Sequence, residues 1–138
     1  MRVFLDANVL FSAAYRDTGS VRVFFAIAAR GVCSLVASPY AIEEARRNIA
    51  MRYPDRAAAL EALAARIEAC REPSPETVAK ALRAGLPAKD APILAAAVEA
   101  GCHILVTGDR THFGKLYGRR WNGTAVMLPA DAVELLIG

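Results

Sequence analysis

Carboxylates at strand ends and helix starts are the residues of this chain whose types and positions best suggest chemistry. Four acids occupy such positions: Asp6, Glu44, Asp90 and Asp109. Asp6 closes the short apolar run 2–5, and Asp109 follows a second apolar run, 103–107. Carboxylates gathered at one place raise one another's pKa and therefore need a neutralising cation. Mg²⁺ and Mn²⁺ prefer oxygen ligands, so these positions predict a divalent-metal site.

Each acid also has an interpretation that involves no metal. Asp6 and Asp109 are typical turn residues, whose side chains bond to nearby backbone. Asp90 precedes Ala91-Pro92, where an N-cap carboxylate is expected on stability grounds alone. Capping a helix and binding a metal are compatible roles. The recurrence of one kind of position, rather than any single acid, favours the metal site.

Glu43 and Glu44 are neighbours on a predicted helix and differ in their surroundings. Glu43 has Arg47 four residues later, which is the spacing of an exposed ion pair. Glu44 has Asn48 at that spacing, so its carboxylate is freer to face a site. Both residues flank the apolar stripe of the helix, and periodicity does not decide between them.

Short apolar strands alternate with helices along the chain. The predicted strands are residues 2–5, 32–37, 103–107 and 124–128. The predicted helices are residues 20–30, 39–51, 53–70, 75–84, 90–100 and 129–137. Two Ser-Pro pairs supply an N-cap followed by proline in the first helical turn, and glycines follow several helices. Residues 108–123 are predicted to form a long loop, of a length that suggests function.

This alternation predicts an α/β fold with parallel strands joined by right-handed crossovers. Open sheets of that kind bind ligands at the carboxyl ends of their strands. Asp6 and Asp109 follow two such ends.

The composition fits one domain of 138 residues that needs no disulfide or structural metal. The 55% hydrophobic content is high for so small a chain, so some apolar surface is expected between subunits. Three widely spaced cysteines form no Cys-x-x-Cys pair and indicate no zinc site. The net charge of +3 and the pI near 9.0 permit nucleic-acid binding without demonstrating it.

The longest apolar stretches, residues 23–29 and 91–98, fall short of the ~18 residues that a membrane-spanning helix needs. Asp6 interrupts the N-terminal region where a secretory signal requires an unbroken apolar segment. The sequence therefore predicts no membrane association and a cytoplasmic location.

Four motifs, taken in order, resemble those of the PIN domain family. They are Leu5-Asp6-Ala7-Asn8, Ser38-Pro39 with Glu44 on the following helix, Lys89-Asp90-Ala91-Pro92-Ile93-Leu94, and Leu105-Val106-Thr107-Gly108-Asp109. The resemblance spans essentially the whole chain as one domain, residues 1–138. It implies a three-layer α/β/α sandwich with a central parallel sheet. It also implies a metal-dependent ribonuclease activity, typical of the toxins of VapBC-type toxin–antitoxin pairs.

The resemblance further implies roles for individual residues. The acidic quartet of the family, catalytic and metal-binding, falls on Asp6, Glu44, Asp90 and Asp109. This match selects Glu44 over Glu43. Asn8 and Thr107 are implied as supporting polar groups. The implied cofactor is Mg²⁺ or Mn²⁺, the implied substrate is RNA, and the expected partners are a cognate antitoxin and a second copy of the chain.

One position departs from the family pattern. Many members have a further acid three residues after the fourth, where this chain has His112 in Arg110-Thr111-His112-Phe113. His112 could bond the scissile phosphate, ligate a metal, or pack beside Phe113. The departure leaves open whether one ion binds or two.

Basic and aromatic residues near the motifs could contact RNA. The basic ones are Arg110, Lys115, Arg119 and Arg120 in the long loop, with Arg46 and Arg47 on the second predicted helix. Tyr117 and Trp121 could stack on unpaired bases or pack in the core. The alternative function is a non-catalytic RNA- or protein-binding module that retains the fold. A nucleotide-binding domain is disfavoured, because no glycine-rich turn follows the first strand.

Overall fold

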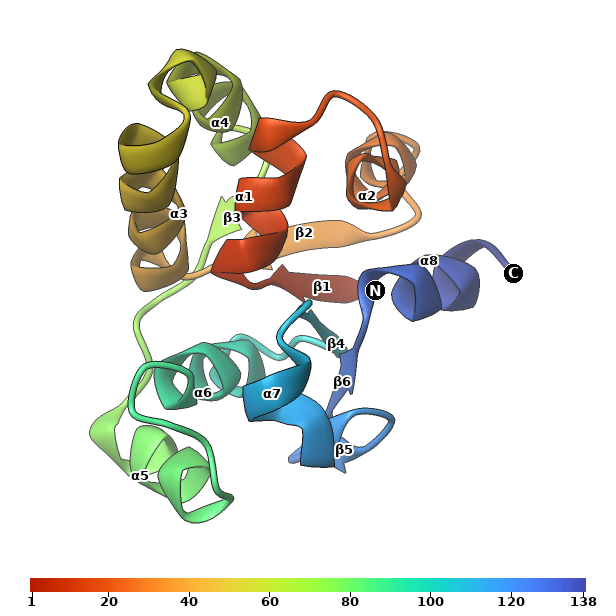
Figure 1. Ribbon diagram of the computed structural model, residues 1–138. Helices are drawn as coiled ribbons and strands as arrows, with labels where there is room; N and C mark the ends of the chain where they lie inside the picture. The colour runs from red at the N-terminus through yellow and green to blue at the C-terminus, as the bar shows by residue number, and fades with distance from the viewer.

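The computed structural model describes residues 1–138 and is organised around a six-stranded sheet with the order β3-β2-β1-β4-β6-β5 (Figure 1). The strands are β1 Arg2–Leu5, β2 Ser34–Ala37, β3 Glu68–Ala69, β4 Ile104–Val106, β5 Arg120–Trp121 and β6 Thr124–Met127. Neighbouring strands pair in parallel, except that β5 runs antiparallel to β6 at one edge. The predicted α/β fold with a central, mostly parallel sheet is therefore confirmed.

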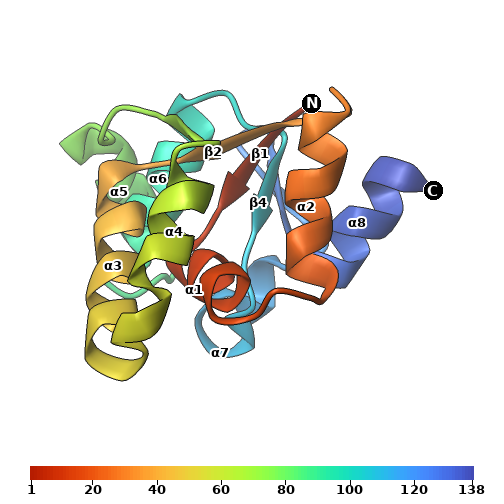
Figure 2. The same ribbon diagram turned by 90° about the horizontal axis from the view of Figure 1, so that it is seen from above.

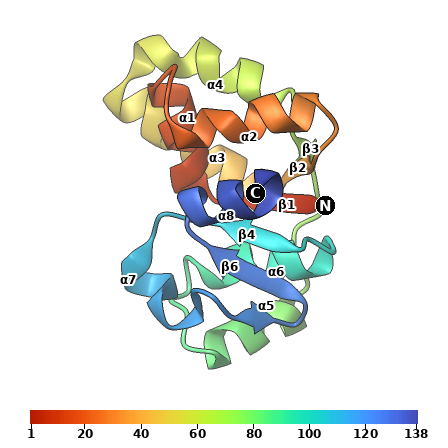
Figure 3. The same cartoon turned by 90° about the vertical axis from the view of Figure 1, so that its right-hand side faces the viewer.

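Helices cover both faces of the sheet and complete three layers (Figure 3). They are α1 Ala7–Tyr15, α2 Ser20–Ala29, α3 Pro39–Arg52, α4 Ala57–Ala64, α5 Pro75–Arg83, α6 Ala91–Glu99, α7 Arg110–Phe113 and α8 Pro129–Ile137. Helices α1 to α4 lie on one side of the sheet, and α5 to α7 lie on the other. Helix α8 packs beside α2, as the view from above shows (Figure 2).

Alternate residues of the strands pack into two separate hydrophobic cores, because successive side chains of a strand point to opposite faces of the sheet. In β1, Val3 and Leu5 belong to the core under α1 to α4, whereas Phe4 belongs to the core under α5 and α6. In β4, Ile104 and Val106 face the first core and Leu105 the second. All of these side chains are buried, so the central strands are apolar on both faces.

The boundaries of two helices follow from their caps. Ser38 Oγ accepts a hydrogen bond of 3.2 Å from the Ala41 N–H, and Pro39 occupies the first turn of α3. Ser74 caps α5 in the same way. The helix at the C-terminus, Pro129–Ile137, has the predicted bounds.

Three sequence predictions about local structure are wrong. Helix α1 was not expected, because Asp6 was interpreted as the end of a strand and not also as the start of a helix. The helix predicted over residues 53–70 ends at Ala64 and is followed by the edge strand β3. The predicted loop at 108–123 contains α7, a 3₁₀ turn at Gly114–Leu116 and β5.

No helix is long and apolar enough to cross a membrane. The three cysteines are free thiols, and Cys33 and Cys102 are buried.

Candidate metal centre

All four carboxylates predicted from the sequence line one cleft at the carboxyl ends of β1 and β4. The cleft has a volume of about 160 Å³ and is lined by Asp6, Ala7, Asn8, Phe11, Glu44, Asn48, Arg52, Lys89, Asp90 and Asp109. These residues come from segments far apart in the sequence: the β1–α1 junction, α3, the start of α6 and the loop after β4. The parallel sheet brings Asp6 and Asp109 together because β1 and β4, which they follow, end at the same edge, and the helices α3 and α6 add Glu44 and Asp90.

Asp6 is positioned by the junction of β1 and α1. Its backbone N–H continues the pairing with β4 by donating to Val106 O at 3.0 Å, and its side chain caps α1 by accepting from the Ala7 N–H at 2.7 Å. The residue is only 5% exposed. Burial raises the pKa of the Asp6 carboxyl to about 6, hydrogen bonds from Thr107 and Ala7 oppose the rise, and the Asp90 and Glu44 charges add to it.

Thr107 and Asn8 tie the ends of the two central strands together. Thr107 Oγ1 donates to Asp6 Oδ2 at 2.7 Å and accepts from the Asp109 N–H at 3.1 Å. Asn8 Oδ1 accepts from the Gly108 N–H at 3.1 Å, and Asn8 Nδ2 donates to Asp6 Oδ2 at 3.3 Å. Both side chains therefore donate to the Asp6 carboxylate and accept from the backbone of the loop after β4.

Glu44 faces the cleft and Glu43 does not. Glu44 is half-buried on α3. Glu43 is exposed on the outer side of the helix and lies 3.7 Å from Arg46, so its ion pair is with Arg46 and not with the predicted Arg47. Arg46 also forms a two-pronged ion pair with Glu61 of α4, which occupies its guanidinium.

Asp90 stands at the N-cap position of α6, but its carboxylate makes no capping hydrogen bond. Its backbone is already helical, with φ −98° and ψ −24°, whereas a capping residue normally has extended angles. The expectation that this carboxylate caps the helix is therefore wrong. Asp90 is 4% exposed, and its Oδ2 atom has no hydrogen-bond partner.

The charge at Asp90 is only partly compensated. Burial raises the pKa of the Asp90 carboxyl, the nearby His112 ring lowers it, and the Asp109 charge raises it again. His112 Nδ1 lies 3.1 Å from Asp90 Oδ2 without forming a hydrogen bond to it.

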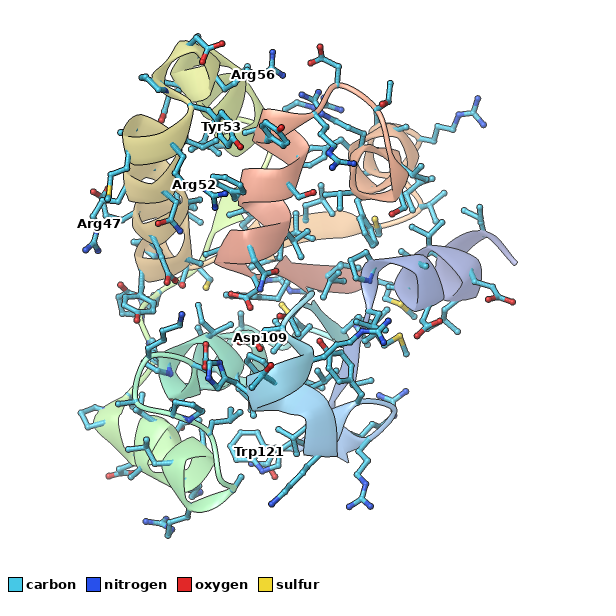
Figure 4. The ribbon with its side chains drawn as sticks, viewed as in Figure 1. Arg47, Arg52, Tyr53, Arg56, Asp109 and Trp121 are labelled. Atoms are coloured by element: carbon cyan, nitrogen blue, oxygen red, sulfur yellow. The ribbon has the colours of Figure 1, made fainter.

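Asp109 and His112 are joined within the first turn of α7 (Asp109 is labelled in Figure 4). Asp109 Oδ1 caps the helix by accepting from the His112 N–H at 3.0 Å, and Oδ2 lies 2.6 Å from His112 Nδ1. Burial alone would raise the pKa of Asp109, but these hydrogen bonds outweigh it and hold the pKa below its usual value. The His112 side chain is 39% exposed, so it does not pack in the core beside Phe113, which is fully buried.

The cleft suits a small divalent cation. It presents carboxylate oxygens, the ligands that Mg²⁺ and Mn²⁺ prefer. A buried carboxylate oxygen without a partner, as at Asp90, is costly unless a cation or proton neutralises it. Burial, with a smaller contribution from neighbouring carboxylates, raises the pKa of both Asp6 and Asp90, so their charged forms are costly without a cation.

An aromatic and cationic cluster beside the cleft was not foreseen. The Phe11 and Tyr15 rings stack with centroids 6.2 Å apart, and the Tyr15 and Tyr53 centroids are 4.2 Å apart. Arg52 Cζ lies 5.0 Å from the Phe11 centroid and 5.6 Å from that of Tyr53. Phe11 and Arg52 also line the cleft. Recognising α1 would have revealed the Phe11–Tyr15 pair, because these residues are four apart and share a helix face.

Arg52, like Lys89, lines the cleft without an ionic partner. It forms no ion pair, although it lines a cleft that contains four carboxylates. Figure 4 shows Arg52 on the side of α3 that faces α1, whereas Arg47 projects from the opposite side. Arg52 is thus a free cation at the rim of the cleft.

Tyr117 and Trp121 pack against the core under α5 and α6. The Tyr117 hydroxyl also donates to Thr107 O at 2.9 Å, behind the carboxylates. These contacts fit the interpretation that Tyr117 and Trp121 pack in the core, and not the interpretation that they stack on bases. Trp121 is labelled in Figure 4, well below the cleft in that view.

The sequence matches a known domain family, and the fold resembles solved structures. A PIN domain family model matches residues 2–111. The structure of VapBC2 from Rickettsia felis, bound to a DNA fragment from their promoter, is similar with a TM-score of 0.71 at 14% identity, over 93% of this chain and 98% of that one. The structure of PAE2754 from Pyrobaculum aerophilum is similar with a TM-score of 0.70 at 22% identity, over 99% of this chain and 89% of that one. The structure of FitAcB from Neisseria gonorrhoeae is similar with a TM-score of 0.60 at 21% identity, over 93% of this chain and 98% of that one.

A search of curated proteins found no match. The fold is that of an α/β protein of the kind seen in those structures. The chain belongs to the PIN domain family.

Proposed function

We propose that this protein is a divalent-metal-dependent ribonuclease that hydrolyses RNA phosphodiester bonds. The observation that best supports the proposal is the convergence of four carboxylates in one cleft, one of which keeps a buried oxygen without a partner. A fold that only bound RNA or protein would have no physical need for this arrangement, because the gathered charges destabilise the metal-free protein. This consideration disfavours the alternative of a non-catalytic binding module.

The positions of the four acids suggest different roles for them in metal binding and proton transfer. Asp6, Asp90 and Asp109 would hold Mg²⁺ or Mn²⁺, and Glu44 would reach it through a water molecule or act as a general base. A bound ion of this kind lowers the pKa of a water molecule and offsets charge on the transferring phosphate. Glu44 would accept the proton of the attacking water as the new P–O bond forms, while the P–O bond to the leaving ribose oxygen breaks and that oxygen takes up a proton from water. Thr107 and Asn8 would keep the Asp6 carboxylate oriented through their hydrogen bonds.

Arg52 and the aromatic cluster support an RNA substrate. A guanidinium without an ionic partner at the rim of an acidic cleft is suited to a backbone phosphate. Tyr15 is 38% exposed, and its ring is available for an unpaired base. Arg110, next to Asp109, is exposed and would contribute a second phosphate contact. Single-stranded RNA would therefore run from the carboxylates over the C-terminal end of α1.

A toxin–antitoxin role is the physiological setting we propose. The VapBC2 and FitAcB structures support it by similarity of fold. The cognate antitoxin would be encoded beside this chain, and its co-expression would suppress RNA cleavage. Cleavage that persists in the presence of the neighbouring gene product would contradict this role and leave the nuclease assignment standing.

A homodimer is proposed from the apolar surface of α8. Leu135 and Ile137 are 53% and 62% exposed, and a cavity of about 560 Å³ lined in part by Val126, Met127 and Leu135 lies beside this helix. A second copy of the chain would cover this surface. Sedimentation is expected to show a dimer at micromolar concentration, and a monomer at that concentration would exclude it.

The direct test of the nuclease is cleavage of a mixed pool of single-stranded RNA. Wild-type protein should cleave in Mg²⁺ or Mn²⁺ and stop when EDTA is added. The Asp6→Asn protein should be inactive in every condition, whereas Glu43→Gln, with its charge removed outside the cleft, should match wild type. Equal activity of wild type and Asp6→Asn would refute the proposed function.

A further inference from the structure

His112 adds a nitrogen ligand atom to two of the carboxylates. Ligand atoms of Asp90, Asp109 and His112 all lie within 4.8 Å of one another. The Nδ1 atom of His112 is 2.6 Å from Asp109 Oδ2 and 3.1 Å from Asp90 Oδ2. Ligand atoms around an octahedral ion with bonds near 2.1 Å are about 3 Å apart. Two of the three separations are therefore already close to the spacing of neighbouring ligand atoms around one ion.

Hydrogen bonding does not explain this arrangement completely. An imidazole Nδ1 carries at most one hydrogen, and the short contact assigns it to Asp109. Asp90 Oδ2 is consequently left without a hydrogen-bond partner, although it points at the same nitrogen and is buried from solvent. A cation placed among the three groups would satisfy Asp90 Oδ2, Asp109 Oδ2 and the Nδ1 lone pair together.

We propose that His112 is a metal ligand through Nδ1, so that Asp90, Asp109 and His112 form a mixed oxygen and nitrogen centre that selects Mn²⁺ or Co²⁺ over Mg²⁺. The inference rests on the proposed metal-dependent function and specifies the ion for that site. For Nδ1 to bind a metal, the neutral ring must carry its hydrogen on Nε2.

The selectivity follows from the donor types. Mg²⁺ is a hard cation that prefers carboxylates and waters and gains little from a neutral imidazole. Imidazole suits the transition metals, whose affinities for such sites rise from Mn²⁺ to Co²⁺ and beyond. A histidine in place of an acid also removes one negative charge, which weakens the attraction for every divalent ion. Only ions that form strong bonds to nitrogen offset this loss of electrostatic binding free energy.

Pulsed electron paramagnetic resonance of bound Mn²⁺ tests the inference directly, because nitrogen bound to the ion produces a measurable nuclear coupling. The chain contains only two histidines, His103 and His112. His103 lies at the opposite end of the sheet, where its Nδ1 accepts from the Arg2 N–H at 3.1 Å, so it is a matched control. The protein should be prepared without a histidine tag. We expect nitrogen coupling in wild type and in His103→Gln, and its loss in His112→Gln.

Affinities give a second readout. The preference for Mn²⁺ over Mg²⁺, measured by calorimetry, should exceed tenfold in wild type. It should fall by at least about tenfold in His112→Asp, which restores an all-oxygen site. The His112 side chain is 39% exposed, so His112→Gln should keep the melting temperature of wild type in EDTA. His112→Asp should melt at a lower temperature in EDTA, because it adds a charge to the gathered carboxylates.

The outcomes separate this inference from the nuclease proposal. Mn²⁺ that binds wild type without nitrogen coupling would overturn the role of His112 and leave a carboxylate-only nuclease site intact. Coupling that survives in His112→Gln would overturn it equally. Failure of Mn²⁺ to bind at all would refute both the inference and the metal dependence. RNA cleavage that is absent while nitrogen coupling is present would refute the nuclease and preserve the metal centre.

Discussion

The Thr107 hydroxyl donates a hydrogen bond of 2.7 Å to Asp6 Oδ2 and thereby joins the carboxyl ends of β1 and β4. Both groups are buried, and the same hydroxyl accepts the backbone N–H of Asp109. One side chain thus orients the Asp6 carboxylate and fixes the backbone of Asp109. Substitution of Thr107 therefore tests whether the cleft must be held in a fixed shape to bind a metal.

Replacing Thr107 by valine should weaken metal binding as well as stability. The change removes the buried hydroxyl, and the loss should cost roughly 1–3 kcal/mol of unfolding free energy. Mn²⁺ affinity should fall by about 10- to 100-fold, because the orientation of Asp6 is lost. Thr107→Ser should retain both properties. Urea unfolding and calorimetry measure the two effects.

Thr124→Val is the matched control for that substitution. Thr124 Oγ1 donates to Cys102 O at 2.7 Å and is also buried, but it lies at the opposite end of the sheet. It should lose comparable stability without any change in Mn²⁺ affinity. An equal loss of affinity in both valine variants would mean that Thr107 acts only through the stability of the fold.

The metal-free protein should become less stable as the pH rises from 4 to 7. The pKa of Asp6 is raised from 3.8 to about 6, so folding favours its protonated form. Its contribution is fully present below the unfolded pKa and is lost as the pH rises through the folded pKa. A shift of about 2 units corresponds to roughly 3 kcal/mol. The raised pKa of Asp90 acts in the same direction, whereas the lowered pKa of Asp109 acts in the opposite one.

Asp6→Asn isolates this effect. The stability of wild type relative to the variant, measured by denaturation in EDTA, should fall steadily across the same pH range. Saturating Mn²⁺ should oppose the fall in wild type alone. A stability difference that does not vary with pH would show that Asp6 is not a buried titrating group.

Arg52→Ala should weaken RNA binding more than Arg47→Ala. Both arginines are on α3 and carry the same charge, but only Arg52 lines the cleft. In an Asp6→Asn background, where binding is separated from cleavage, loss of Arg52 should reduce affinity by about tenfold and the salt slope by about 1. Fluorescence anisotropy with a labelled single-stranded oligonucleotide measures both. Equal effects of the two substitutions would reject a specific phosphate contact at Arg52.

Glu44→Gln and Glu43→Gln should differ sharply although the residues are adjacent. Glu44 lines the cleft, so its neutralisation should abolish most RNA cleavage. Glu43 has only an exposed contact of 3.7 Å with Arg46, and such pairs contribute less than about 1 kcal/mol. Initial rates of cleavage compare the two. A fully active Glu44→Gln protein would remove this residue from the mechanism.

Much of the fold was predictable because its signals are local. The Ser38 and Ser74 caps and the buried apolar strands β1 and β4 act through neighbouring residues, and the structure contains them as expected. Helix α1 was missed because Asp6 serves two purposes, ending a strand and capping a helix without an intervening loop. The two-residue strands β3 and β5 depend on pairing with distant partners, which no local pattern reveals.

The grouping of Asp6 and Asp109 was predictable for a topological reason, since parallel strands align their carboxyl ends, whereas Glu44 was chosen over Glu43 from the family resemblance. The orientation and hydrogen bonding of each carboxylate were not predictable from the sequence. Asp90 has the sequence context of a helix cap, yet its carboxylate turns toward the cleft because the helical backbone of that residue does not permit capping. The Arg52 cluster required knowledge of how α1 packs on α3, which is a tertiary contact.

The central claim is that the carboxylates act by holding a divalent metal, and Asp90→Asn tests it most directly. Asparagine is nearly isosteric, and no capping bond is lost. Because the buried charge is removed, the melting temperature in EDTA should equal or exceed that of wild type. The rate of Mn²⁺-dependent cleavage of single-stranded RNA by this variant is predicted to fall by more than about 100-fold, beyond the effect of losing a supporting residue. An Asp90→Asn protein that cleaves RNA at the wild-type rate would contradict the account.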